Sequence, residues 1–183
     1  MRIESLPVAG PLLVTPGRFA DLRGTFSEVY NQEQFDREVC PVRFVQDNHS
    51  VSIEAGTVRG LHFQVGQKPQ AKLVWVVRGS ILDVAVDIRR QSPTFGQHVS
   101  AILSAENGQQ LWVPVGFAHG FCTLEPNTAV LYKVDQSWSP TDERGILWND
   151  PALAIQWPHV AEKPVVHPKD LQLPTLADCN DLF

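Results

Sequence analysis

Residues 58–88 read VRGLHFQVGQKPQAKLVWVVRGSILDVAVDI, and this stretch decides the fold class. Two runs rich in β-branched residues, 72–77 and 81–88, flank an Arg-Gly-Ser turn, which is typical of a β-hairpin. The second run alternates acidic or small residues with branched apolar ones, so its side chains are expected on opposite faces of a strand. The stretch therefore predicts a β-sheet protein organised around this hairpin.

Three residues in the same stretch are able to carry chemistry. Lys72 shares a strand face with Val74 and Val76, so it is either a solvated strand end or a cation at the mouth of a pocket. His62 lies one loop earlier, close to Arg59. A lone histidine is more often structural than catalytic, and both interpretations stay open at this point. We take His62, Arg59 and Lys72 as the centre of a candidate site.

The rest of the chain repeats the pattern of short β-rich runs, separated by 14 prolines and 12 glycines. Many short strands between turn signals predict an all-β sandwich or barrel. Only residues 31–39 read as a helix, with Asn31 as its N-cap. Beyond residue 158 repeated prolines predict an irregular C-terminal arm over the barrel. The predicted strands are residues 12–14, 24–30, 43–52, 57–64, 72–77, 81–88, 98–103, 110–113, 119–124 and 128–137.

Length and composition set the outer limits. We expect residues 1–183 to form a single domain, since 183 residues with 43% hydrophobic and 19% charged residues suit one well-packed core. The net charge of −5, without a basic run, argues against nucleic-acid binding, so an anionic substrate needs a few dedicated arginines and lysines. Three distant cysteines without a CxxC motif indicate a reducing cytoplasm. The N-terminal residues resemble neither a signal peptide nor a membrane span.

One motif connects the chain to metal-binding β-barrels. Residues 114–119 read PVGFAH, which matches the PxGxxH pattern of the second cupin motif. The first cupin motif supplies HxH, but here that position reads His62-Phe63-Gln64, so one imidazole is missing. A divalent metal needs several convergent nitrogen or oxygen ligands. The sequence therefore predicts no bound metal, and a metal-dependent cupin enzyme remains as the alternative.

Several polar and aromatic residues each fit a structural role when taken alone. Residues 21–31 read as an edge strand with a solvated acid, and residues 46–50 read as a turn or as hydrogen-bonding groups that line a cavity. Tyr132 fits a core tyrosine, and Trp138 fits a packing residue at a strand end. Their occurrence together changes this interpretation.

Eight segments in sequence order resemble the dTDP-4-dehydrorhamnose 3,5-epimerase family, enzymes of deoxysugar nucleotide biosynthesis. They cover nearly the whole chain, so the resemblance is highly specific. The segments are DxRGxFxExYN (21–31), FVQDNHS (44–50), RGLHFQ (59–64), PQAKLV (69–74), DVAVDIR with SPTFG (83–96), LSAENxxQLWVPxGFAHGF (103–121), LYK (131–133) and SPxxExxILWNDP (139–151).

The resemblance implies a cupin-type jelly-roll β-sandwich with short helices, a homodimer, and no metal or organic cofactor. It implies that dTDP-4-dehydro-6-deoxy-D-glucose is the substrate and dTDP-4-dehydro-L-rhamnose the product, in the service of lipopolysaccharide or cell-wall polysaccharide synthesis. No nucleic-acid or membrane partner is expected. Relatives that invert only C3 or only C5 exist, so a mono-epimerase of the same substrate class is the other reading within the family.

Roles for individual residues follow from the same resemblance. His62 would be the base that removes the protons at C5 and C3, with Asp170 holding its imidazole. Lys72 would stabilise the enolate oxygen, and Tyr132 would return a proton from the opposite face. Trp138 would stack on the thymine. The substrate contacts would be Arg23, Phe26, Glu28, Gln46, Asp47, Asn48, Arg59, Lys72, His119, Trp138, Glu143 and Lys169.

Two features depart from the family pattern or conflict with simple strand geometry. Ser137-Trp138 replaces a frequent Tyr-Tyr pair, and Trp75 stands where many members have arginine. Neither departure touches the proposed acid or base. Strict alternation places Arg59 and His62 on opposite faces of a strand, and a bulge at Gly60 would bring them together.

A non-catalytic carbohydrate-binding jelly roll is the third class of protein considered, after the epimerase and the metal-dependent cupin.

Overall fold

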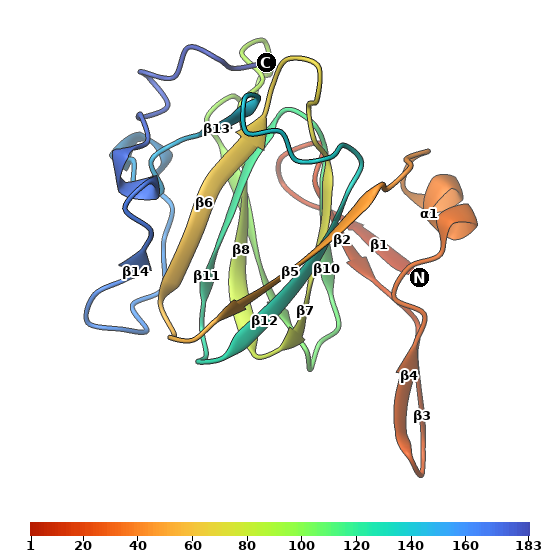
Figure 1. The fold of residues 1–183 in the computed structure, drawn as a ribbon. Helices are drawn as coiled ribbons and strands as arrows, with labels where there is room; N and C mark the ends of the chain where they lie inside the picture. The colour runs from red at the N-terminus through yellow and green to blue at the C-terminus, as the bar shows by residue number, and fades with distance from the viewer.

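The computed structural model describes residues 1–183 and forms a β-sandwich of two facing sheets (Figure 1). The first sheet has the strand order β1 (Arg2–Ser5), β2 (Leu12–Thr15), β10 (Gln110–Val113), β7 (Lys72–Arg78), β12 (Thr128–Val134) and β5 (Gln46–Ser52). The second has the order β13 (Glu143–Gly145), β6 (Thr57–Gln64), β11 (Phe117–Thr123), β8 (Ser80–Asp87) and β9 (His98–Ser104), with β14 (Val165–Val166) beside β6. Every pair is antiparallel except β14 with β6. The predicted all-β jelly-roll class is confirmed.

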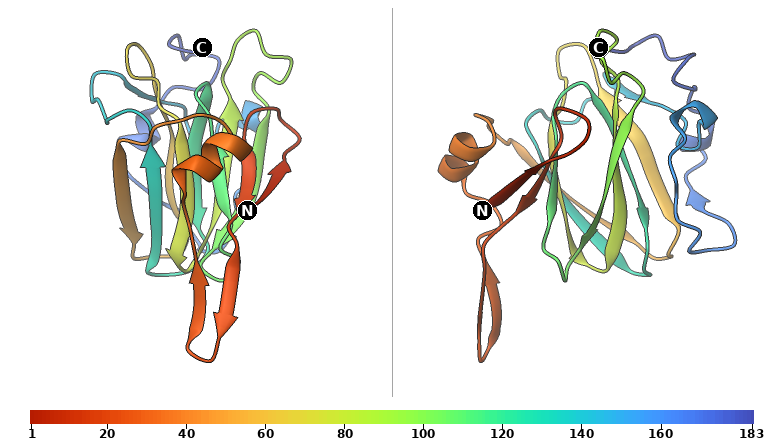
Figure 2. Two further views of the ribbon diagram at one scale, coloured as in Figure 1. Left: turned by 90° about the vertical axis from the view of Figure 1, so that its right-hand side faces the viewer. Right: turned by 180° about the vertical axis from the view of Figure 1, so that it is seen from behind.

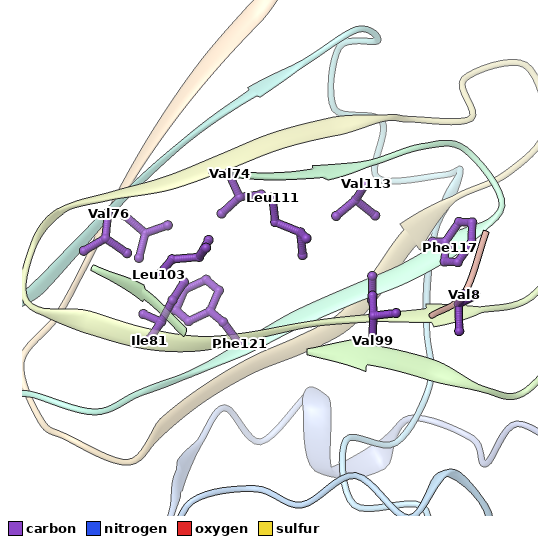
Figure 3. Close-up of a cluster of buried hydrophobic side chains, with 12 residues drawn as sticks. Val8, Val74, Val76, Ile81, Val99, Leu103, Leu111, Val113, Phe117 and Phe121 are labelled. Atoms are coloured by element: carbon purple, nitrogen blue, oxygen red, sulfur yellow. The ribbon is translucent and has the colours of Figure 1, made fainter. Parts of the chain in front are cut away.

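The main core fills the space between the two sheets. Figure 3 shows Val74 and Leu111 from the first sheet together with Ile81, Leu103 and Phe121 from the second. All five side chains are buried. Because each strand alternates its side chains, the residues that β7, β8 and β11 contribute to this core lie at alternate positions along each strand.

A second core lies on the outer face of the second sheet. Val84 and Val86 of β8 pack there with Leu61 and Phe63 of β6, under the segment that follows β13. The predicted alternation of β8 is therefore correct, but both of its faces are buried. In Figures 1 and 2 the blue C-terminal segment covers this side of the molecule, which confirms the predicted arm over the barrel. It contains two short 3₁₀ turns, η1 (Pro151–Leu153) and η2 (Asp170–Gln172).

The single α-helix, α1 (Gln32–Glu38), lies on the opposite side of the sandwich from the C-terminal arm (Figure 2). The Asn31 side chain caps it by accepting a hydrogen bond from the Gln34 amide at 3.1 Å, as predicted. Phe35 is fully buried against Phe44 and Trp112, and this contact fixes α1 on the first sheet. None of the helices combines the length and the apolar character needed to span a membrane.

A two-stranded hairpin, β3 (Arg18–Asp21) and β4 (Gly24–Ser27), projects from the body of the sandwich (Figures 1 and 2). Phe19 and Phe26 on it are 68% and 70% exposed. The predicted strand 24–30 corresponds to β4 but ends earlier, and its partner β3 was not predicted. The other predicted strands agree with the structure to within a few residues at their ends, whereas β1, β13 and β14 were not predicted.

Candidate active site

A cavity of about 600 Å³ opens between the two sheets and is closed on one side by the C-terminal arm. Strands of both sheets and the segment 165–170 supply its walls. The polar side chains that line it are Ser50, Thr57, Arg59, His62, Lys72, His119, Tyr132, His167, Lys169 and Asp170. The structure thus brings together seven of the residues predicted for the site: Arg59, His62, Lys72, His119, Tyr132, Lys169 and Asp170.

A bulge in β6 lets both Arg59 and His62 face this cavity. His119 pairs with His62 and Phe121 pairs with Arg59, so a two-residue step on β11 matches a three-residue step on β6. Gly60 sits at the extra position with φ of +113°, and a Cβ there would lie 2.6 Å from the His119 carbonyl oxygen. Only glycine fits this close approach. The bulge predicted at Gly60 is confirmed.

His62 is paired with Asp170 of the arm. The distance between His62 Nε2 and Asp170 Oδ1 is 2.9 Å, and the Gly60 amide donates to Asp170 Oδ2 at 3.4 Å. Burial acts to raise the pKa of Asp170, but the hydrogen bond and charge of His62, with the Gly60 amide, outweigh it and hold that pKa below its ordinary value. An ionised Asp170 accepts from Nε2–H, which leaves Nδ1 of His62 as the free proton acceptor.

Lys72 is buried at the start of β7, where it is only 8% exposed. Its Nζ donates to the His62 carbonyl oxygen at 3.3 Å. Burial lowers the pKa of Lys72 to about 8, while the negative charges of Asp83 and Glu143 act in the opposite direction. The structure therefore resolves the open choice: Lys72 is a cation inside the cavity rather than a solvated strand end.

A second histidine–carboxylate pair lies deeper in the sandwich. His119 Nε2 is 2.7 Å from Asp83 Oδ1, and both residues are buried. Asp83 was not predicted as a site residue. The sequence did carry a signal for it, since Asp83 is an acidic residue in an otherwise apolar strand. A buried carboxylate needs a partner, so such a residue indicates a polar contact inside the fold.

Tyr132 and His62 approach the cavity from different sheets, since Tyr132 lies on β12 and His62 on β6. Burial raises the pKa of Tyr132, although the nearby Arg59 charge acts to lower it. Tyr132 therefore keeps its phenolic proton near neutral pH. A ligand between the sheets has a possible base on one side and a possible proton donor on the other.

A smaller polar hollow of about 350 Å³ shares Tyr132 with the main cavity. Trp138, which is 55% exposed, donates from Nε1 to Glu143 Oε1 at 3.2 Å. The second oxygen of Glu143 pairs with Lys169 Nζ at 2.6 Å, which ties the arm to β13. The hollow is lined by Gln46, Asn48, Gln70, Tyr132, Trp138 and Glu143, so four further predicted residues gather here.

Four predicted contacts lie elsewhere in this chain. Asp47 points to the opposite face of β5 from Gln46 and Asn48, and it pairs with Lys133 at 2.8 Å. The other three are Arg23 and Phe26 on the projecting hairpin and the exposed Glu28 just after it, none of which lines the main cavity. No group of three or more His, Cys, Asp or Glu side chains is arranged to hold a metal ion.

The fold and the site define a class: a cupin-type jelly roll whose cavity is lined by titratable side chains. A family model described as dTDP-4-dehydrorhamnose 3,5-epimerase matches residues 5–178. The chain belongs to the dTDP-4-dehydrorhamnose 3,5-epimerase family, a family of isomerases.

Individual relatives agree with this assignment. A dTDP-4-dehydrorhamnose 3,5-epimerase from Sinorhizobium fredii is 49% identical, over 97% of this chain and 91% of the relative. The crystal structure of a dTDP-6-deoxy-D-glucose-3,5-epimerase from Legionella pneumophila, in complex with dTDP-4-keto-L-rhamnose, has a TM-score of 0.93 and 41% identity, covering 98% of this chain and 94% of that chain. A dTDP-4-dehydrorhamnose 3-epimerase from Streptomyces niveus is less similar, at 36% identity over 99% of this chain and 86% of the relative.

Proposed function

We propose that this chain inverts C3 and C5 of dTDP-4-dehydro-6-deoxy-D-glucose and forms dTDP-4-dehydro-L-rhamnose. The family assignment and the greater similarity to 3,5-epimerases than to a 3-epimerase support this substrate and the double inversion. One observation carries the chemistry: His62 and Tyr132 line the same cavity from facing sheets. Inversion at carbon requires proton removal on one face and proton return on the other.

The proposed reaction starts at the carbons on either side of the C4 ketone. Their protons are acidic because the resulting carbanion is delocalised onto the ketone oxygen as an enolate. His62 removes each proton through Nδ1, while the Asp170 carboxylate accepts a hydrogen bond from Nε2–H and stabilises the imidazolium that forms. The ammonium of Lys72 stabilises the enolate oxygen, and Tyr132 protonates the carbon from the opposite face.

The nucleotide part of the substrate is proposed to occupy the smaller hollow. Trp138 offers an exposed indole on which the thymine stacks, with Gln46, Asn48 and Glu143 as polar contacts. Arg59 and Lys169 line the main cavity and offer positive charge to the diphosphate, and His119 adds a polar contact to the substrate. Because the chain carries a net charge of −5, such local cations are needed to hold an anion.

Arg23, Phe26 and Glu28 are proposed to act in a homodimer. Their hairpin is paired only with itself and carries exposed apolar side chains, with Leu22 at its tip. A partner's sandwich would cover these side chains and place Arg23 or Phe26 at the partner's cavity. The three free cysteines, Cys40, Cys122 and Cys179, fit the reducing cytoplasm that we propose as the location.

Incubation with the keto-sugar nucleotide in heavy water tests the proposal directly. We expect deuterium at both C3 and C5 of a product with the L-rhamno configuration, read by NMR. Deuterium and inversion at one carbon alone would assign the chain to the mono-epimerases. Exhaustive chelation with EDTA is expected to leave turnover unchanged, and loss of turnover that a divalent metal restores would point to a metal-dependent cupin. A protein that binds the nucleotide sugar without any exchange would be a carbohydrate-binding module.

A further inference from the structure

His167 stands where the arm turns from β14 into η2. Val165 and Val166 before it pair in parallel with Thr57 and Val58 of β6. The η2 turn after it brings Asp170 back to His62. His167 also lines the main cavity, yet none of the roles described above uses it. It therefore lies between the fixed part of the arm and the carboxylate that the proposed base requires.

All three amides at the start of the turn donate to His167. The Lys169 amide donates to the imidazole Nδ1 at 3.1 Å. The amides of Asp170 and Leu171 donate to the His167 carbonyl oxygen at 2.8 and 3.3 Å. Asn, Asp, Ser and Thr side chains commonly accept from the amide two residues on, and so fix a turn or cap a helix. His167 accepts the same kind of hydrogen bond, but with a ring nitrogen.

The other anchors of the turn are side chains that reach away from it: Lys169 pairs with Glu143 at 2.6 Å, and Asp170 pairs with His62, so His167 supplies the side-chain contact within the turn itself. η2 spans three residues and has no side-chain cap of its own at Lys169. Lys169 and Leu171 are exposed, whereas Asp170 is buried with its carboxylate against His62 and the Gly60 amide. A shift of the turn by a fraction of an ångström would lengthen the 2.9 Å contact between Asp170 and His62, so whatever fixes the turn also fixes the base.

We infer that His167 is a positioning residue: its unprotonated Nδ1 holds the Lys169 amide and thereby sets Asp170 against His62. The inference rests on the proposed function, because it concerns the geometry of the base that this function requires. His167 acts through Asp170 and touches neither the reacting carbons nor the enolate oxygen. A different side chain at position 167 should therefore do the same work, provided that its hydrogen-bond acceptor lies at the same distance from the backbone as Nδ1 of His167.

Three variants of the full-length protein test the inference. His167→Ala removes the acceptor, and His167→Asn restores an acceptor without the imidazole. His159→Ala removes another exposed histidine of the arm that does not line the main cavity, and it serves as the matched control. We expect His167→Ala to lower kcat by about tenfold, the effect of losing one capping hydrogen bond, with KM little changed. We expect His167→Asn and His159→Ala to keep kcat within about twofold of the starting protein.

Amide hydrogen exchange, measured without substrate, provides a second readout of the turn. The Lys169 amide is expected to exchange faster in His167→Ala and at the original rate in His167→Asn. Unchanged exchange in His167→Ala would overturn the inference. The inference would also be overturned if His167→Asn lost as much activity as His167→Ala and both variants had a raised KM. His167 would then contact the substrate directly. An inactive starting protein would overturn the proposed function, whereas amide exchange would still decide whether His167 holds the turn.

Discussion

The cavity and the β3–β4 hairpin hold their functional side chains in opposite ways. In the cavity His62, Lys72 and His119 stand on strands that are paired on both sides, and each contacts a carboxylate or a carbonyl of the sandwich or of the arm. On the hairpin Arg23 pairs only with Asp21, two residues away, and both are exposed. The cavity therefore fixes the geometry of its own side chains, whereas the only fixed partner of Arg23 in this chain lies on the same hairpin.

The largest effect is expected at the centre of the cavity. His62→Ala removes the only imidazole paired with Asp170, so carbanion formation loses its base and both deuterium exchange and epimerisation should fall by about 10⁴-fold, the upper end of the usual range. NMR of the sugar protons in heavy water measures both. If exchange persists at the original rate, another group removes the protons and the cavity is not organised as we propose.

Tyr132→Phe should separate the two halves of the reaction. The variant keeps His62 and Lys72, so the enolate still forms and is reprotonated only from the side of His62. We expect continued solvent exchange with inversion slowed by ~10²–10⁴-fold, the usual cost of losing a positioned general acid. Inversion at the original rate would make Tyr132 a wall residue. Loss of exchange as well would mean that the tyrosine is needed to form the enolate or to hold the substrate.

The hairpin should be separable from the cavity by mixing subunits. Arg23→Ala is expected to lower kcat/KM by about 10- to 100-fold, because a charged hydrogen bond to the substrate is lost. When Arg23→Ala is refolded together with His62→Ala, a mixed dimer has one site with both original residues. About a quarter of all sites should then be active if the subunits assort at random.

No recovery of activity in the mixture would contradict the contribution of the hairpin in trans. A fully active monomer by light scattering at assay concentration would contradict the dimer itself. Thermal unfolding supplies the control: Arg23→Ala should unfold at the temperature of the starting protein, since Arg23 is exposed and outside the core.

The smallest expected effect is a dependence of kcat/KM on pH, which arises from Lys72 in the cavity and does not involve the hairpin. With the pKa of Lys72 near 8, kcat/KM should be halved near pH 8 and fall about tenfold per pH unit above it. Unfolded Lys72 keeps its proton up to the ordinary pKa of 10.5, so between about pH 8 and 10.5 this group makes stability rise with pH. The loss of activity is thus not unfolding caused by Lys72. Lys72→Arg, which stays charged, should be slower but should lack this decline.

Local patterns in the sequence predicted the fold well where a strand or helix is set by its own residues. The β7–β8 hairpin and the Asn31-capped helix α1 were found because alternation and capping are local signals. β3 was missed because its sequence, RFAD, carries no apolar alternation and its only partner is β4. β14 was missed because two residues in parallel with β6 are defined by tertiary pairing alone.

The site could be predicted only in part for the same reason. Family motifs indicated His62 and Lys72, the family resemblance implied Asp170, and the structure brings the three together. The partner of His119 was not predicted, because Asp83 lies on β8, and the pairing of β8 with β11 is a tertiary contact. Asp47 was grouped with its neighbours, yet strand alternation turns it to the other face.

The distance along the chain between His62 and Asp170 has a consequence for biosynthesis. A ribosome that adds 5–20 residues per second needs roughly 5–20 s to extend the chain from His62 to Asp170, a separation of 108 positions. Late in that time the strands through Val134 have been made, whereas the arm that covers Val84 and Val86 is still incomplete. The nascent sandwich therefore passes through a period in which the apolar outer face of its second sheet is uncovered and His62 lacks its Asp170 partner. Docking of the arm then covers this face and completes the His62–Asp170 pair, so the proposed activity would begin only after the exposed sheet has been covered.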